Sequence, residues 1–113
     1  MFKAILEIEE YRYLSENEKN SYKVRISTSF SELGIYEIVK EARETNTLNQ
    51  IKSFIIEIIS ALTYMDRNRK NEYISMIGRS INKSIVEQIF EDAKKEDEQL
   101  KEIQEAKKTA IAQ

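Results

Sequence analysis

The stretch that decides the predicted fold is residues 22–62, which reads YKVRISTSFSELGIYEIVKEARETNTLNQIKSFIIEIISAL. Apolar and polar side chains alternate through its first nine residues, and a period of two predicts a half-buried β-strand over residues 22–30. Ser31 follows as an N-cap, because its hydroxyl can accept a hydrogen bond from a free amide of the first helical turn. The sequence therefore predicts a strand that is followed directly by a helix.

Two helices are predicted after this strand. The first runs from Ser31 to about Arg43 and is expected to end at Thr45-Asn46-Thr47, where Asn46 can adopt the left-handed conformation common at helix ends. The second covers about residues 48–65 and is apolar around most of its circumference. A helix of this kind is buried or faces a second subunit.

The flanks of this stretch complete the prediction. Residues 2–9 also alternate, which predicts a second short strand, although a helix is the alternative there because Phe2, Ile5, Leu6, Glu9 and Tyr13 share a helical stripe. The polar residues 15–21 are expected to form a loop. Beyond residue 66 a short helix is expected to end at Gly78, and Ser84 with Glu87 has the spacing of a capping box that begins a last helix. No internal repeat is apparent.

The predicted fold class is therefore mainly α with a small β element (α+β), with one or two short N-terminal strands and about four helices, the last long and charged. At 113 residues the chain has the size of a single domain. Within this domain, residues 1–113, we expect an N-terminal strand and loop (1–20), a strand–helix–helix unit (21–65) and C-terminal helices (66–113).

Four residue types are missing from the chain, namely His, Cys, Pro and Trp. Without His and Cys there is no side chain that ordinarily titrates near neutral pH and no thiolate nucleophile, so we expect no enzyme, no metal site and no cofactor. Charged residues make up 34% of the chain and its net charge is −2, which argues against a disordered polyelectrolyte and against a uniformly basic nucleic-acid binder. No apolar run is long enough to cross a bilayer, so we expect no membrane partner and a cytoplasmic protein. The bias toward Ile, Lys, Asn and Glu is typical of AT-rich genes and suggests a low-GC bacterium or a phage, in which case the location is the host cytoplasm or the virion.

The order of strand, capped helix, turn and apolar helix in residues 22–62 resembles the ribbon–helix–helix (Arc/MetJ-like) DNA-binding family. In that family two chains pair their strands into a ribbon that enters the DNA major groove. The resemblance implies that Arg25, Ser27 and Ser29 contact bases and that amides near Asn49 and Gln50 hold a phosphate. An alternative stays open, because residues 2–9 can pair with residues 22–30 of the same chain and replace the ribbon.

Two further sets of residues are candidates for contacts. The resemblance and the apolar second helix together predict an oligomer interface formed by Ile26, Phe30, Phe54, Ile55, Ile58, Ile59 and Leu62. A basic patch is predicted in the middle of the chain, formed by Arg67, Arg69, Lys70, Arg79 and Lys83. The basic patch suits phosphate or an acidic partner, or it is an exposed loop between helices.

The sequence as a whole predicts a non-enzymatic, small, oligomeric interaction protein. The specific hypothesis is a dimeric DNA-binding regulator, or a partition adaptor whose C-terminal helix recruits a protein partner. The alternative is a phage or mobile-element protein that acts by protein–protein contact, as a virion assembly component or an inhibitor of a host machine. Leu100, Ile103 and Ile111 are the residues of the last helix that would dock in a partner.

Overall fold

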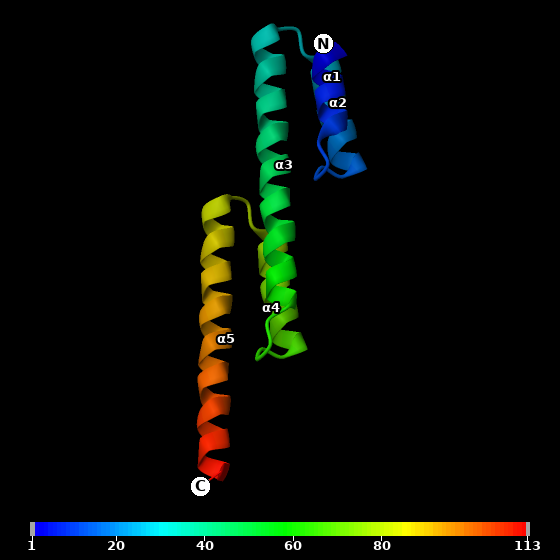
Figure 1. Ribbon diagram of the computed structural model, residues 1–113. Helices are drawn as coiled ribbons and strands as arrows, with labels where there is room; N and C mark the ends of the chain where they lie inside the picture. Colours follow the sequence, from blue (N-terminus) through cyan, green and yellow to red (C-terminus); the bar gives the residue numbers. More distant parts are fainter. Residues whose placement is uncertain (1, 113) are drawn as a thin grey trace. The chain divides into compact units, whose positions relative to one another are not determined.

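The computed structural model describes residues 2–112, and it describes their side chains over residues 3–110. These residues form five α-helices and no β-strand (Figure 1). The helices are α1 (Phe2–Glu10), α2 (Glu16–Thr28), α3 (Glu32–Ser60), α4 (Arg67–Arg79) and α5 (Lys83–Ala112). Within the described range, none of these helices combines the length and the apolar character that a bilayer crossing requires.

The predicted α+β fold class was wrong, because both predicted strands are helical. Residues four apart lie on the same side of a strand and also on the same face of a helix, so the alternation in residues 22–30 is compatible with both structures. In α2, Tyr22 and Ile26 are buried, whereas Val24, which a strand would bury with them, is 62% exposed. The Ser15–Glu18 capping box decides between the two, because it begins a helix within the predicted loop.

The predicted break at Thr45-Asn46-Thr47 was also wrong, and α3 is one helix through this point. Each of the three polar side chains has a hydrogen-bond partner that leaves the helical backbone intact. The Thr45 hydroxyl bonds the Tyr22 hydroxyl, the Asn46 Oδ1 accepts from the Tyr13 amide, and the Thr47 hydroxyl donates to a carbonyl one turn earlier.

The predicted ends of the later helices shift by a few residues. Gly78 lies inside α4, which Ser80 caps, and neither glycine has a positive φ. At the start of α5 the Asn82 Oδ1 accepts from the Ile85 amide at 3.0 Å, so Asn82 acts where Ser84 was predicted.

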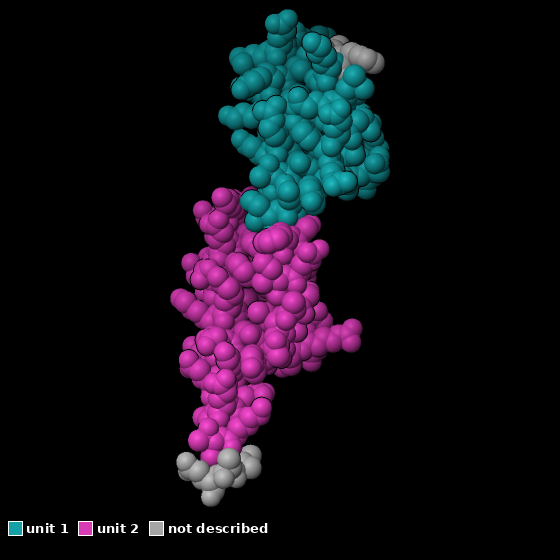
Figure 2. All heavy atoms as spheres, in the orientation of Figure 1, with its two compact units in different colours: residues 1–51 teal, residues 52–113 magenta. Residues whose placement is uncertain are grey.

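The chain divides into two compact units, residues 1–51 and residues 52–113, and the boundary falls within α3 (Figure 2). In the first unit α1, α2 and the first part of α3 share one core. Its buried residues are Ile8, Leu14, Tyr22, Ile26, Val39 and Ala42. The second unit contains the end of α3 with α4 and α5. Its buried apolar residues are Ile55, Ile59, Met65, Tyr73, Ile77, Val86, Ile89 and Ala93.

The two units are repeats of one another at a spacing of 51 residues, which the sequence analysis did not find. Helices α2 and α4 each have 13 residues, and they begin 51 residues apart. Helices α3 and α5 also begin 51 residues apart. The pairs of identical residues that this spacing gives between the first unit and the second are Ile5/Ile56, Ile8/Ile59, Tyr13/Tyr64, Asn17/Asn68, Lys19/Lys70, Asn20/Asn71, Tyr22/Tyr73, Ile26/Ile77, Ser29/Ser80, Ile38/Ile89 and Ala42/Ala93. Each unit is thus one supersecondary unit of three helical segments, as in helical-repeat proteins.

Candidate functional site

Three contacts that occur in both units show which of the repeated residues hold the fold. The Tyr22 hydroxyl bonds Thr45 at 2.9 Å, and the Tyr73 hydroxyl donates to Glu96 at 3.1 Å, at the same repeat positions. These bonds join the second helical segment of each unit to the third. The repeated tyrosines therefore have a structural role.

A second repeated contact holds the first loop of each unit. The Asn46 Oδ1 accepts from the Tyr13 amide at 2.8 Å, and the Asp97 Oδ1 accepts from the amides of Tyr64 and Met65 at 3.0 and 2.9 Å. Because loop amides have no partner within a helix, a side-chain acceptor from the third segment fixes the loop.

A third repeated contact involves the identical lysines. Lys19 Nζ donates to the Glu9 carbonyl at 3.0 Å, and Lys70 Nζ donates to the Ser60 carbonyl at 3.2 Å. Both carbonyls belong to the last turn of a helix, where the backbone acceptors have no partner in the helix itself. The lysines thus cap the first helical segment of each unit.

The charged cluster of the second unit joins α4 to α5. Arg69 Nε and Nη2 donate to the Glu96 carboxylate at 2.8–3.0 Å, and Arg69 Nη1 donates to Glu72 at 2.6 Å. The guanidinium also lies 4.7 Å from the centre of the Tyr73 ring. These hydrogen bonds raise the pKa of Arg69. The pKa of Glu96 is lower than its ordinary 4.5, because the hydrogen bond from Arg69 and a weaker one from Tyr73 outweigh the effect of burial, which would raise it. Burial and the bond to Glu96 raise the pKa of Tyr73.

This cluster predicts an acid-sensitive second unit. Because the pKa of Glu96 is lower in the folded protein than its ordinary 4.5, its ionised form stabilises the fold above about pH 4.5, and the contribution is lost as the pH falls through the folded-state pKa. We expect the Glu96→Gln protein to have a lower melting temperature than the wild type at pH 7. The difference between the two melting temperatures should become smaller as the pH falls below 4. Melting curves followed by circular dichroism between pH 7 and pH 3 measure this.

The control for this prediction is Glu98→Gln, because Glu98 is exposed and makes no ion pair among the described residues. Its melting temperature should follow that of the wild type at each pH. A Glu96→Gln protein that stays below wild type by a constant amount at all pH values would contradict the assignment.

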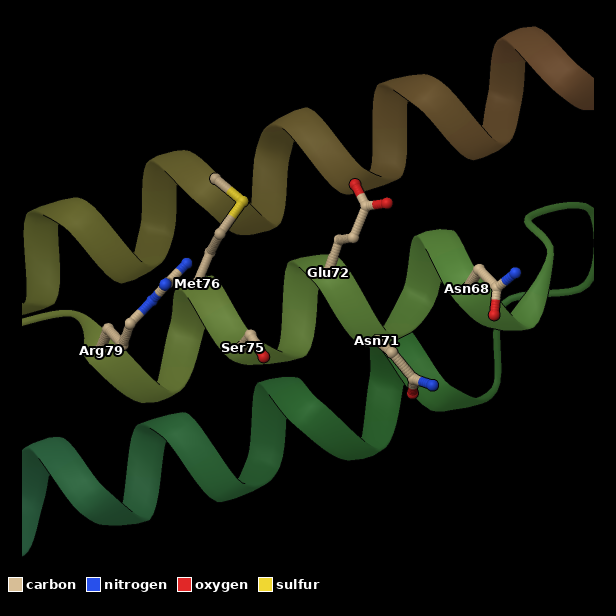
Figure 3. Close-up of a pocket in the computed structure, with 6 residues that line it drawn as sticks. All are labelled: Asn68, Asn71, Glu72, Ser75, Met76 and Arg79. Carbon is tan, nitrogen blue, oxygen red and sulfur yellow. The ribbon is translucent and has the colours of Figure 1, made fainter.

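Besides these structural contacts, α4 carries a shallow hollow (Figure 3). Its lining residues are Asn68, Asn71, Glu72, Ser75, Met76 and Arg79. Figure 3 shows Glu72 and Met76 extending to the side of α4 on which α5 lies, and Asn71 extending to the other side. A second hollow is formed by α2 with one residue of α3, and it is lined by Asn17, Glu18, Ser21, Tyr22, Arg25 and Glu41. Three of these residues, Asn17, Ser21 and Arg25, are the repeat equivalents of Asn68, Glu72 and Met76. Both hollows thus contain the first residue of a repeated pair of asparagines.

The asparagine pairs Asn17/Asn20 and Asn68/Asn71 are exposed, and none of their side chains makes a hydrogen bond within residues 3–110. The chain has three other asparagines, and each of those side chains makes a hydrogen bond to a backbone group. The fold therefore accounts for Asn46, Asn49 and Asn82, and it does not account for the two pairs. Their carboxamides can donate and accept hydrogen bonds at the same time.

Apolar side chains are exposed where the second segment of each unit connects to the third. Phe30 is fully exposed at this connection in the first unit, and Ile81 is 80% exposed at the equivalent position in the second. Leu33 and Ile85 add exposed apolar surface close by in the chain. We refer to Phe30 with Leu33, and to Ile81 with Ile85, as the apolar tips.

The residues predicted to contact DNA do not form one surface. Arg25, on α2, pairs with Glu41 at 2.8 Å and lies over the Tyr22 ring. Ser27 is exposed on α2 and Ser29 caps that helix. Asn49 Nδ2 donates to the Tyr13 carbonyl at 2.9 Å, so it holds the loop of the first unit. The ribbon that the resemblance implies needs a strand at residues 22–30, and these residues are helix and cap.

The predicted oligomer interface divides into buried and accessible residues. Ile26, Ile55 and Ile59 are buried within their own units, and Ile58 and Leu62 are half-buried. Phe30 and Phe54 are exposed. Of the seven predicted interface residues, only these two are exposed.

The predicted basic patch contains residues with different roles. Arg69 and Lys83 pair with glutamates, and Lys70 caps the end of α3. Arg67 and Arg79 are exposed at opposite ends of α4. Within the part of the chain that the structure describes, no three acidic side chains converge in a group that could hold a metal ion.

The asparagine pairs and, apart from Phe30, the residues of the apolar tips are surface features that the sequence analysis missed. The signal was present as N-x-K-N-x-Y, which occurs at residues 17–22 and again at residues 68–73. A comparison of the chain with itself at a spacing of 51 residues would have found it.

The chain matches no protein-family model, no curated protein and no solved structure.

Proposed function

We propose that this protein is a non-enzymatic interaction protein that acts by protein–protein contact and self-associates through its apolar tips. The observation that carries the proposal is that Phe30 and Ile81, at equivalent positions of the two units, are both exposed to solvent. Exposed apolar side chains that occur together mark surfaces that another molecule covers. The partner proposed here is a second copy of the chain.

DNA is not the proposed partner, although the resemblance to ribbon–helix–helix proteins pointed to it. The residues of the implied ribbon lie in α2, and Arg25 is already paired with Glu41. The apolar tips, in contrast, match a protein surface, because apolar contact area is what stabilises most protein complexes.

The double substitution Phe30→Ser/Ile81→Ser tests this proposal. Both side chains are largely exposed, so we expect the fold to survive their replacement. Size-exclusion chromatography with light scattering, over about a hundredfold range of concentration, should show a wild-type mass that rises above 13.3 kDa and a variant mass that does not.

Phe54→Ser is the matched control, because Phe54 is 64% exposed but lies outside the apolar tips. Its mass should rise with concentration as in the wild type. A wild-type protein that stays monomeric throughout, or a Phe54→Ser protein that alone loses association, would show that the apolar tips do not mediate self-association.

A further inference from the structure

The repeated pattern N-x-K-N-x-Y contains two kinds of residue, those whose side chains form hydrogen bonds within their unit and those whose side chains form none in the described part of the chain. Its lysine caps a helix and its tyrosine bonds the third segment in both units. Its two asparagines are exposed in both units and make no hydrogen bond within residues 3–110. Asn17 and Asn68 lie in the first turn of their helices, whereas Asn20 and Asn71 lie further inside, where asparagine is less favourable than alanine.

We propose that each asparagine pair binds the main chain of an extended polypeptide segment. A carboxamide presents one donor group and one acceptor oxygen, and so does each peptide unit of an extended chain. This match lets a carboxamide bond the main chain of a peptide.

The spacing within each pair agrees with this ligand. Residues three apart on a helix have Cβ atoms about 5–6 Å apart and lie on the same face. Peptide groups that face the same edge of an extended chain repeat about every 6.8 Å, which is twice the rise of one residue. Two adjacent carboxamides of one pair can therefore reach successive peptide groups on one edge.

The surroundings of the pairs favour a polypeptide over a nucleic acid. A nucleic-acid site needs available cations and exposed aromatic rings. Near the pairs, Arg25 and Arg69 are engaged by glutamates, and the rings of Tyr22 and Tyr73 are buried. Arg67 and Arg79 are exposed on α4, but the equivalent positions on α2 are Glu16 and Thr28, so available cations are not a shared feature of the two sites. Val24, four residues after Asn20, offers an exposed apolar contact for a peptide side chain.

This inference goes beyond self-association through the apolar tips, since α2 and α4 form the proposed site. The test uses the full-length protein to select binders from a displayed library of random linear dodecapeptides. A selected peptide is then synthesised, and its affinity is measured by fluorescence anisotropy. Because the hydrogen bonds from several carboxamides are lost, Asn17→Ala/Asn20→Ala/Asn68→Ala/Asn71→Ala should weaken binding at least about tenfold.

Two controls make the result specific. Gln50→Ala/Gln99→Ala/Gln104→Ala removes exposed carboxamides elsewhere and should leave the affinity unchanged. N-methylation of alternate main-chain amides of the peptide should weaken binding to the wild type, because it removes the donors that the asparagines accept from. The tip variant Phe30→Ser/Ile81→Ser should bind the peptide as the wild type does, which separates this site from self-association.

Several outcomes would overturn the proposal. They are the failure to enrich any peptide, binding that survives the fourfold asparagine substitution or N-methylation, and loss of binding in the tip variant. Binding of a single-stranded oligonucleotide in place of peptides would also overturn it. A lower melting temperature of the fourfold variant would assign the asparagines a structural role instead, whereas a binding site predicts an equal or higher one.

Discussion

Replacing Ile59 by alanine should lower the free energy of unfolding of the second unit by about 2–4 kcal/mol, the range typical for an isoleucine that is fully buried in a core. Ile59 has no exposed surface, and neither has Ile8, its equivalent in the first unit. The loss has two sources, namely the transfer energy of the removed carbons and the cavity that remains. Ile8→Ala should therefore have a similar effect in the first unit.

The repeat makes this prediction more specific than a loss of total stability. In helical-repeat proteins the stability of each unit is set by that unit and its neighbours in the chain. Hydrogen exchange should show that Ile59→Ala lowers protection mainly in residues 52–113, and that Ile8→Ala lowers it mainly in residues 1–51. Ile103→Ala is the control, because Ile103 is half exposed and its loss should cost little. Equal loss of protection in both units from either core variant would contradict the division into two units.

Asp97→Ala should cost about 2–3 kcal/mol in the free energy of unfolding, because the Asp97 carboxylate accepts from two loop amides and both would lose their partner. One of these amides belongs to Met65, whose side chain is buried. The loop would then have unpaired donors next to the core of the second unit, and unpaired buried donors are more costly than the bonds themselves are stabilising. Urea denaturation followed by circular dichroism measures the loss.

The repeat supplies a matched control for the loop contact. Asp97→Asn keeps an oxygen that can accept the same two hydrogen bonds. It places asparagine where the first unit has Asn46, which accepts one hydrogen bond from the Tyr13 amide. It should cost less than about 1 kcal/mol, and Asn46→Ala should cost about 1 kcal/mol for its single bond. An Asp97→Asn protein as unstable as Asp97→Ala would show that the charge, rather than the acceptor, holds the loop.

Where the sequence prediction succeeded, it relied on signals that are local in the chain. The helical character of residues 32–43 and 48–60 was predicted correctly, since apolar residues recur there with a helical period. The last, long and charged helix was also predicted correctly, although its cap is Asn82 and not Ser84. These elements follow from the amino-acid pattern with little help from distant residues.

Where the prediction failed, residues distant in sequence decide the structure. The polar side chains at residues 45–47 look like a helix end, but Tyr22 and Tyr13 supply bonding partners from 23 and 33 positions away. The strand predicted at residues 22–30 is an exception, because the signal that favours a helix there, the Ser15–Glu18 capping box, is local and lay within the predicted loop.

The candidate site was missed for a related reason. An exposed asparagine in a sequence of high charge carries no local signal, and its meaning depends on knowing that every other asparagine is bonded. That knowledge requires the tertiary contacts of Asn46 and Asn49. The apolar tips likewise required the exposed fractions of Phe30 and Ile81.

The helical pattern of α3 and α5, the lack of His and Cys, and the identical residues repeated at a spacing of 51 can all be identified from the amino-acid sequence. Contacts between distant segments were needed to establish that α3 continues past Thr47 and which repeated residues the fold uses. The physical reason is that helical periodicity is encoded in near neighbours, whereas burial and the satisfaction of polar groups depend on segments brought together by folding.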